Sequence, residues 1–399
     1  MKSGWRVGSI FGIPLMLDPS WFFILIAVTY VYGVTWQDLE WGQNIAWIAG
    51  FVMALALFGS VLLHELGHSV VALSQGIRVN SITLFLFGGI ASIDRESKTP
   101  GQAFQVAIAG PAVSFSLFVI LFLLQNVVRW SDPLTTIVQD LANINLVLAL
   151  FNMIPGLPLD GGQVLKAAIW KATGDRFRGV RWAAKVGQTL GWMAIIIGVV
   201  LFFRFGAFDA LWIALLGWFG VRNANAYSSL TNVQEALLTI KAADAMTRDF
   251  RVVDAAWTLR EFAEHHLIHE APPTTYYAAS NGRYRGMVSV DVLRETDRNL
   301  WDSRTLNDIA EPLDNLPSIL ETASLAEVVR DLDEKNTKHL TVLSPAGAVS
   351  GVIDRGDVVQ AIAEKMRVLI PKRMIQQIKE EGTYPAGLPL DAIAKSALD

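Results

Sequence analysis

Two histidines four residues apart follow a long apolar run. Residues 61–68 read Val-Leu-Leu-His-Glu-Leu-Gly-His, and residues 41–63 carry no charged side chain. On a helix, His64 and His68 project from one face about one turn apart, so both imidazoles can bind a single metal ion. Glu65 lies beside them and can take a proton from a water that the metal activates. This pattern is typical of a zinc site that catalyses hydrolysis.

The setting of this motif argues against two ordinary helix histidines with local partners. Ionisable side chains at the end of a membrane-length segment are costly to bury, and they usually serve a function. The chain contains no cysteine, which excludes thiolate zinc ligands, disulfides and a cysteine nucleophile.

The composition predicts a membrane protein with a separate soluble domain. The chain has 399 residues, of which 52% are hydrophobic, and its mean hydropathy is +0.37, which is too apolar for an ordinary soluble protein. Residues 1–230 carry 14 Lys and Arg against 11 Asp and Glu, whereas residues 231–399 carry 19 against 26. No strong basic patch suggests a nucleic-acid partner. We expect a membrane domain at 1–230, a soluble domain at 231–370 and a C-terminal tail at 371–399.

Apolar stretches within the first domain predict six transmembrane helices, at residues 19–37, 45–73, 99–128, 141–159, 186–203 and 205–221. We interpret the first as an anchor, because no small-residue cleavage site follows a short apolar region. Residues 76–94 are rich in β-branched and aromatic side chains around Gly88 and Gly89, which predicts a β-hairpin. The expected fold is an α-helical polytopic membrane protein with a small membrane-associated hairpin, followed by a soluble α/β domain.

Basic residues are unevenly divided between the predicted loops. The loops on the side of the N-terminus carry eleven Lys and Arg, whereas the opposite loops carry only Arg129 and Arg204. By the positive-inside rule, we expect both termini, the hairpin and the soluble domain in the cytosol, with the helices in the lipid bilayer of the inner or plasma membrane. His64, His68 and Asp160 then all lie near the cytosolic ends of their spans.

The chain resembles the site-2 protease family of intramembrane zinc metalloproteases. The matching motifs lie within residues 10–225 and are His64-Glu65-Leu66-Gly67-His68, Phe87-Gly88-Gly89, Gly110-Pro111 and the segment from Asn152 to Gly161, Asn-Met-Ile-Pro-Gly-Leu-Pro-Leu-Asp-Gly. The resemblance implies one Zn²⁺ per chain, bound by His64, His68 and Asp160. It also implies that Glu65 is the catalytic base and that Asn152 helps to hold the substrate carbonyl or the oxyanion. Ser114 departs from the pattern, because many relatives have asparagine there.

Elimination among the residues also favours Asp160 as the third ligand. A catalytic zinc site uses about three protein ligands and keeps one position open. The other four histidines lie in the soluble domain, so a carboxylate is needed. Asp160 is close to two prolines and two glycines, which open a helix and let the backbone turn inward. Asp140 is predicted on the far side of the membrane, Asp18 lacks such turn residues, and Asp391 follows no apolar span.

Hydrolysis inside a membrane constrains both the site and the substrate. Water must reach the metal, so we expect a protein-lined polar cavity near the cytosolic face. The substrate would be a transmembrane protein, whose helix has to unwind before its carbonyls can react. The hairpin edge at Gly88 and Gly89 could hold the unwound segment by strand addition. The alternative is that this glycine pair forms only a tight turn.

The soluble domain contains two segments, residues 242–300 and 303–366, with the same order of features. They resemble a tandem pair of CBS domains, α/β modules that often bind adenine nucleotides. Asp357 stands at the position of the family's ribose-binding carboxylate, although Asp354 replaces the usual Ser or Thr, and Val292 replaces the carboxylate in the first copy. The resemblance implies either binding of ATP or AMP at Asp357 or a purely structural role, including a homodimer through these domains.

We therefore expect an intramembrane zinc endopeptidase that performs regulated intramembrane proteolysis. One alternative is a transporter or channel gated by the CBS domains, which would repeat polar residues along several spans. Another is a catalytically inactive binding protein of the same fold, which the intact His64, Glu65, His68 and Asp160 disfavour.

Two further features receive simpler interpretations. We interpret His265, His266 and His269 as polar surface residues of the soluble domain rather than as a metal cluster. The tail from Pro371 predicts a solvated helix followed by flexible chain rather than a regulatory peptide.

Overall fold

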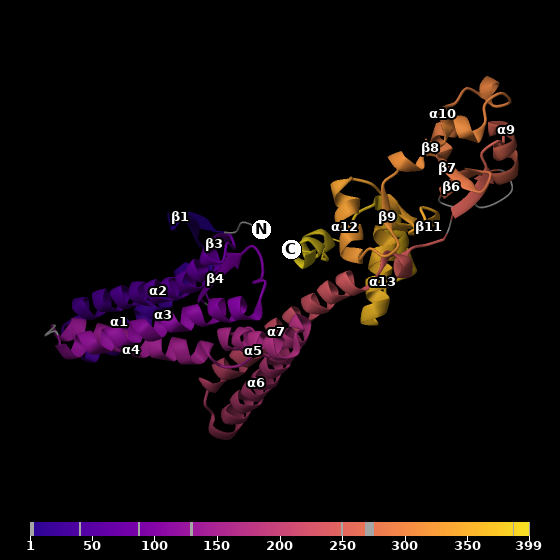
Figure 1. Cartoon of the computed structure of the whole chain (residues 1–399). Helices are drawn as coiled ribbons and strands as arrows, with labels where there is room; N and C mark the ends of the chain where they lie inside the picture. The colour runs from indigo at the N-terminus through magenta and orange to yellow at the C-terminus, as the bar shows by residue number, and fades with distance from the viewer. Residues whose placement is uncertain are drawn as a thin grey trace. The chain divides into compact units, whose positions relative to one another are not determined.

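The computed structural model describes residues 4–39, 41–86, 88–127, 131–248, 250–267, 275–385 and 387–398. The chain divides into two compact units, Met1–Thr231 and Asn232–Asp399 (Figure 1). Each unit has buried hydrophobic clusters of its own.

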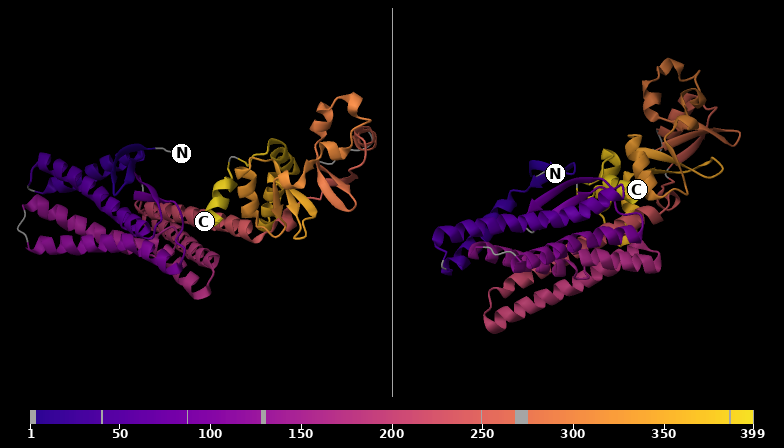
Figure 2. Two further views of the ribbon diagram at one scale, coloured as in Figure 1. Left: turned by 45° about the horizontal axis from the view of Figure 1, so that its top comes forward. Right: turned by 60° about the vertical axis from the view of Figure 1, so that its left-hand side comes forward.

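The first unit is mostly helical. Its first four long helices run side by side as a bundle (Figures 1 and 2); they are α1 (Ser20–Thr35), α2 (Gln43–Ser74), α3 (Pro100–Val127) and α4 (Asp132–Asn152). The later helices are α5 (Asp160–Thr173), α6 (Arg176–Phe205) and α7 (Ala210–Thr239). Side chains on the outside of the bundle are largely apolar, as expected where a helix faces lipid.

Five of the described helical segments are long and apolar enough to cross a membrane: Ser20–Asp38, Gln43–Ser74, Pro100–Val127, Asp132–Asn152 and Arg176–Phe205. The sixth predicted span, 205–221, is not among them. Helix α6 ends at Phe205 and Gly206 caps it in the left-handed region (φ 64°), before α7 begins at Ala210. The apolar part of α7 ends near residue 221 and polar sequence follows, so it falls short of the roughly 20 residues that a span requires.

The fourth predicted span is displaced along the chain. It was expected at 141–159, but α4 begins at Asp132, with Pro133 in its first turn, and ends at Asn152. Residues 153–159 form turns, because Pro155 and Pro158 cannot continue a helix. Asp160 therefore begins a new helix, α5.

A four-stranded sheet packs against the C-terminal half of α2. Its order is β1 (Trp5–Ile10), β2 (Ile13–Leu17), β3 (Val79–Phe85) and β4 (Gly88–Ile93). Strands β2 and β3 are parallel, and the other neighbours are antiparallel. The hairpin expected within 76–94 is the β3–β4 pair, whereas β1 and β2 were not predicted. Strand β4 is an edge strand, and β3 lies inside the sheet.

The second unit contains two interlocked copies of a small α/β arrangement. The strands of the first copy are β5 (Phe250–Asp254), β6 (Thr275–Ser280) and β7 (Arg283–Val288), and those of the second are β9 (Ser318–Leu320), β10 (His339–Leu343) and β11 (Val349–Asp354). Strand β8 (Glu311–Pro312), from the second copy, pairs with β7 of the first. In return, Thr247 forms a β-bridge with Val352 of β11. Each copy thus completes the sheet of the other.

The C-terminal tail is part of the core of the second unit, so the expectation of a solvated helix followed by flexible chain was wrong. Helices α14 (Lys372–Glu381) and α15 (Leu390–Leu398) bury Ile375, Ile378, Leu390 and Ile393. These side chains join a cluster with residues of α12 (Leu325–Glu334) and α13 (Arg355–Met366). The isoleucines are three residues apart, so they share one helix face, and this apolar face packs inward although charged residues flank it at 372–373 and 379–381.

Because the tail is buried, shortening one of its apolar side chains should clearly lower the stability of the second unit. Ile378 is 4% exposed, so Ile378→Ala should lower the free energy of unfolding of the second unit by about 2–5 kcal/mol. The control is Gln377→Ala, at an exposed neighbouring position on the same helix. Pulse proteolysis of the full chain in urea, with detection of fragments from 232–399, measures this change. Equal unfolding midpoints for the two variants would contradict the packing.

Candidate metal centre

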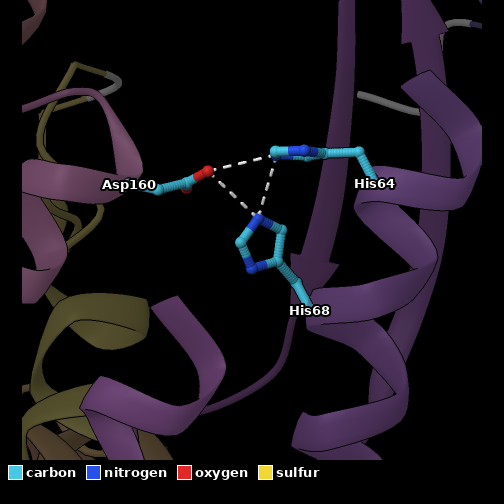
Figure 3. Close-up of side chains that lie close together, drawn as sticks. All are labelled: His64, His68 and Asp160. Atoms are coloured by element: carbon cyan, nitrogen blue, oxygen red, sulfur yellow. Dashed lines mark hydrogen bonds and ion pairs between the residues drawn. The ribbon is translucent and has the colours of Figure 1, made fainter. Parts of the chain in front are cut away.

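Three side chains from two helices meet in one cluster (Figure 3). His64 Nε2 lies 3.1 Å from Asp160 Oδ2, and His68 Nε2 lies 3.3 Å from the same oxygen. The two Nε2 atoms are 3.3 Å apart. Both histidines are buried and Asp160 is half-buried. Within the described part of the chain, this is the one group of His and carboxylate side chains arranged to hold a metal ion.

The three separations fit zinc. Ligands about 2.0–2.2 Å from a tetrahedral zinc ion lie about 3.3 Å from one another. The His68 Nδ1–H group donates to the carbonyl oxygen of Val106 (2.7 Å), so Nε2 of His68 presents a lone pair to the cluster. A lone pair and a carboxylate this close repel each other unless a cation or proton lies between them. Two imidazoles and one carboxylate also leave a fourth zinc position open, as catalytic sites require.

Helix α3 fixes the orientation of both imidazole rings. Val106 binds Nδ1 of His68, and Ser114 Oγ lies 2.9 Å from Nδ1 of His64. Ser114 therefore makes a hydrogen bond at the position where the sequence departs from the family pattern. The role of Val106 was not predicted, because a backbone carbonyl leaves no signal in the residue type.

Gly110 allows α3 to approach the metal ligands. A Cβ atom built there would overlap Nε2 of His68 and lie 2.7 Å from Nε2 of His64. At Gly67, a Cβ atom would lie 2.9 Å from the carbonyl oxygen of Ala109, so α2 and α3 are in close backbone contact. Helix α3 continues through the Gly110-Pro111 pair, and its glycine provides space for the two imidazoles.

The turn between α4 and α5 places Asp160. Cβ atoms built at Gly161 and Gly162 would overlap the backbone of Met153 and Leu157, so the first turn of α5 lies directly on the preceding loop. The Leu157 N–H group donates to the carbonyl oxygen of Ala183 on α6 (3.2 Å). The loop is therefore held between two helices, which fixes the start of α5.

An ion pair connects α5 to the segment that follows the hairpin. Lys166 on α5 is only 7% exposed, and its Nζ lies 3.0 Å from Oε2 of Glu96. Arg176 Nη1 lies 3.6 Å from the same oxygen. A buried ammonium group needs such a partner, because removal of the carboxylate would leave its charge uncompensated. The helix that carries Asp160 is thus tied to the chain just beyond β4.

Glu65 contacts the edge strand of the sheet. The Ala91 N–H group donates to Glu65 Oε2 (3.2 Å), and a Cβ atom at Gly89 would lie 2.5 Å from Glu65 Cγ. Gly89 therefore leaves room for this side chain. Gly88 begins β4 with φ 129°, in the region that favours glycine. Phe87, the first residue of that motif, lies outside the described residues.

Asn152 is the half-buried last residue of α4, eight positions before Asp160. Sequence reasoning missed a buried pair between α2 and α4, in which Asn145 Nδ2 donates to Ser60 Oγ (2.9 Å). The available signal was that Ser60 precedes His64 by four residues, so the two share a helix face.

The remaining predicted residues belong to the second unit. Asp357 is buried in the first turn of α13, and Lys379 Nζ lies 2.5 Å from its Oδ1. His265 Nδ1 hydrogen-bonds to the carbonyl oxygen of Glu261, whereas His269 lies outside the described residues.

Comparisons with known proteins were made for both units. Residues 52–131 and 128–197 match Peptidase family M50, and residues 306–364 match the CBS domain. A Synechocystis protein that is provisionally named a zinc metalloprotease is 40% identical over 367 residues, which cover 91% of this chain and 96% of the relative. Rip3 of Mycobacterium tuberculosis, also provisionally named a zinc metalloprotease, is 31% identical over 321 residues, with coverage of 80% and 82%. The solved structure of a site-2 protease from Methanocaldococcus jannaschii is 27% identical, covers 56% of this chain and 95% of its own, and has a TM-score of 0.42.

The contact of Gly110 with the histidines predicts that Gly110→Ala weakens zinc binding by about 10–100-fold, because the added methyl group displaces both rings. Gly101→Ala on the same helix is the matched control, since a Cβ atom there meets nothing within 4 Å. Zinc affinity should be measured by competition with a chelator on each purified protein. If Gly110→Ala binds zinc as tightly as the wild type, α3 does not define the positions of the two histidines.

Proposed function

The chain belongs to peptidase family M50, the site-2 protease family, and on that premise we propose that it is an intramembrane zinc endopeptidase that cleaves transmembrane segments of membrane proteins. The proposal rests chiefly on one observation. His64, His68 and Asp160 meet at zinc-ligand separations among apolar helices, and Glu65 lies within the same motif. The arrangement combines a hydrolytic site with the environment of a transmembrane substrate.

Each polar group near the site has a proposed part in the reaction. A bound Zn²⁺ supplies Lewis acidity, which polarises the scissile carbonyl and activates water near neutral pH. Glu65 acts as general base: the Ala91 N–H group holds Oε2, so Oε1 takes the proton from the attacking water. The same carboxyl group then gives the proton to the leaving amine. The Asn152 side chain donates a hydrogen bond to the substrate carbonyl or to the oxyanion.

The substrate binds, in this proposal, as an added strand on β4. This strand is an edge of the sheet, and the Ala91 N–H group already points away from β3 towards Glu65. An unwound peptide paired with this edge would have its carbonyls beside the base. Gly88 and Gly89 carry no side chains that would hinder its approach. Strand β3 cannot play this part because β2 and β4 flank it.

We also propose an orientation in the membrane. Basic residues are concentrated on the N-terminal side of the predicted loops, which supports cytosolic termini, a cytosolic sheet and a cytosolic second unit in the inner or plasma membrane. This topology requires the apolar part of α7, residues 210–221, to act as a short sixth span.

The second unit is the proposed regulatory part. The CBS domain that matches residues 306–364 includes Asp357, which we assign to the ribose hydroxyls of ATP or AMP. The same unit could also form a homodimer. Nucleotide binding there would regulate cleavage in the first unit.

Two other functions fit the observations less well. A CBS-gated transporter or channel would need polar side chains along several spans, whereas among the described residues one group of His and carboxylate side chains is arranged to hold a metal ion. An inactive binding protein of the same fold would not need the complete set of two histidines, a base and an aspartate.

The assignment of Glu65 predicts that Glu65→Gln reduces cleavage of a transmembrane substrate by at least about 100-fold, because glutamine cannot take a proton. Zinc content should stay at the wild-type level, since Glu65 is not a ligand. The His64→Ala variant should lose both zinc and cleavage. Zinc per chain and product formation should be measured on the same preparations. Substantial proteolysis by zinc-loaded Glu65→Gln protein would refute the mechanism.

Strand addition predicts where a substrate contacts the sheet. A photo-crosslinking side chain at Ile90 of β4 should capture substrate in the Glu65→Gln background, because this edge holds the unwound segment. The same group at Trp5 of β1 is the matched control, since both residues are exposed, at 56% and 60%, and lie on opposite edge strands. Equal capture at both positions would leave β4 with a structural role only.

A further inference from the structure

The tail helix α14 covers the turn in the second unit to which we assign nucleotide binding. Lys379 of α14 places its Nζ 3.0 Å from Asp354 Oδ2 and 2.5 Å from Asp357 Oδ1. Asp357 is only 7% exposed. Its other oxygen, Oδ2, accepts from the Asp354 N–H group (3.1 Å). Both carboxylate oxygens of Asp357 therefore already have a partner within the protein, and Asp357 is too deeply buried for a ribose hydroxyl to reach it while α14 is in place.

The backbone of α14 also lies directly on this turn. A Cβ atom at Gly356 would lie 2.5 Å from Cγ of Lys379 and 3.2 Å from the carbonyl oxygen of Ile375. The start of α13, whose N-terminal end would otherwise attract a phosphate, is capped by Asp354, which accepts from the Asp357 N–H group (2.9 Å). The space next to Gly356 is therefore filled by the helix.

A second contact lies where the chain leaves α14. The guanidinium group of Arg355, in the same turn, lies 5.5 Å from the ring centroid of Tyr384. Arg355 is itself held by the carbonyl oxygen of Thr337 (2.8 Å) and by Asp333 Oδ1 (2.6 Å). The tail thus contacts the turn at Asp354, Arg355, Gly356 and Asp357.

The charges favour this arrangement. Two carboxylates, Asp354 and Asp357, lie side by side and share one ammonium group, that of Lys379. Burial and the neighbouring Asp354 raise the pKa of Asp357 to about 6, although Lys379 opposes this shift. Without Lys379 the two carboxylates would repel each other, so a cationic partner stabilises the closed turn.

We propose that α14 is an internal occupant of the nucleotide site, and that an adenine nucleotide binds at Asp357 only when α14 withdraws. This inference rests on the nucleotide site proposed above. The buried Ile375 and Ile378 favour the closed state, and the apparent affinity for nucleotide falls in proportion to the fraction of open molecules. Nucleotide binding is thereby coupled to release of the tail.

The test compares two lysine substitutions on α14 in the full chain. Lys379→Met keeps the length of the side chain but removes the ammonium group, and it should raise the affinity for AMP and ATP by at least about tenfold. Lys372→Met is the control, because Lys372 is exposed on the same helix. Equilibrium dialysis of the detergent-solubilised protein against each nucleotide gives the dissociation constants.

The outcomes separate this inference from the proposed nucleotide site. Tighter nucleotide binding by Lys379→Met than by the wild type supports the proposal that α14 occupies the site. Detectable binding by Lys379→Met alone supports it as well. If the wild type binds nucleotide and Lys379→Met binds it equally or more weakly, α14 is not an occupant of the site, and the proposed nucleotide site itself is retained. Absence of binding by every protein at millimolar nucleotide rejects both.

A second measurement uses the unaltered chain, so it does not depend on folding of a variant. Amide hydrogen exchange across residues 372–381 should become faster when AMP saturates the protein, because α14 leaves its place. Unchanged or slower exchange under saturation would overturn the inference.

Discussion

Polar side chains among apolar helices have to find their partners inside the protein, because lipid offers none. This requirement governs the first unit. His64 and His68 each use Nδ1 to bind α3 and turn Nε2 towards Asp160 of α5. Three helices must therefore meet at one point, and Gly110 lets α3 come close enough for that meeting.

The remaining elements of the unit support this meeting point from several directions. Helix α6 holds the turn before Asp160, and the ion pair of Lys166 with Glu96 holds the helix after it. Glu96 follows β4, the strand whose Ala91 binds Glu65. Asp160 on α5 and Glu65 on α2 are thus linked through one continuous piece of chain, so a disturbance of the sheet reaches both side chains.

The sequence could predict those parts of the site whose chemistry is local. Residues four apart share a helix face, so the spacing of His64 and His68 predicts that their side chains lie together. The prolines and glycines around Asp160 predict a turn. Contacts made by backbone atoms, such as the carbonyl of Val106 and the N–H group of Ala91, leave no trace in residue type. Strand β2 was missed because its parallel partner β3 lies more than 60 residues later in the chain, and β1 is attached to the sheet only through β2. The packing of α14 was missed because charged residues obscured two isoleucines on one face.

The parallel pairing of β2 with β3 has a consequence for biosynthesis. Helices α1 and α2 lie between these strands in the chain, so the ribosome must complete both before the sheet can close. Strand β2 therefore waits at the membrane surface while two apolar helices are inserted. The support for Glu65 depends on β4, which is synthesised later still. Under the proposed topology and mechanism, the histidine motif therefore enters the bilayer before the sheet that holds the general base exists, and catalytic competence follows membrane insertion.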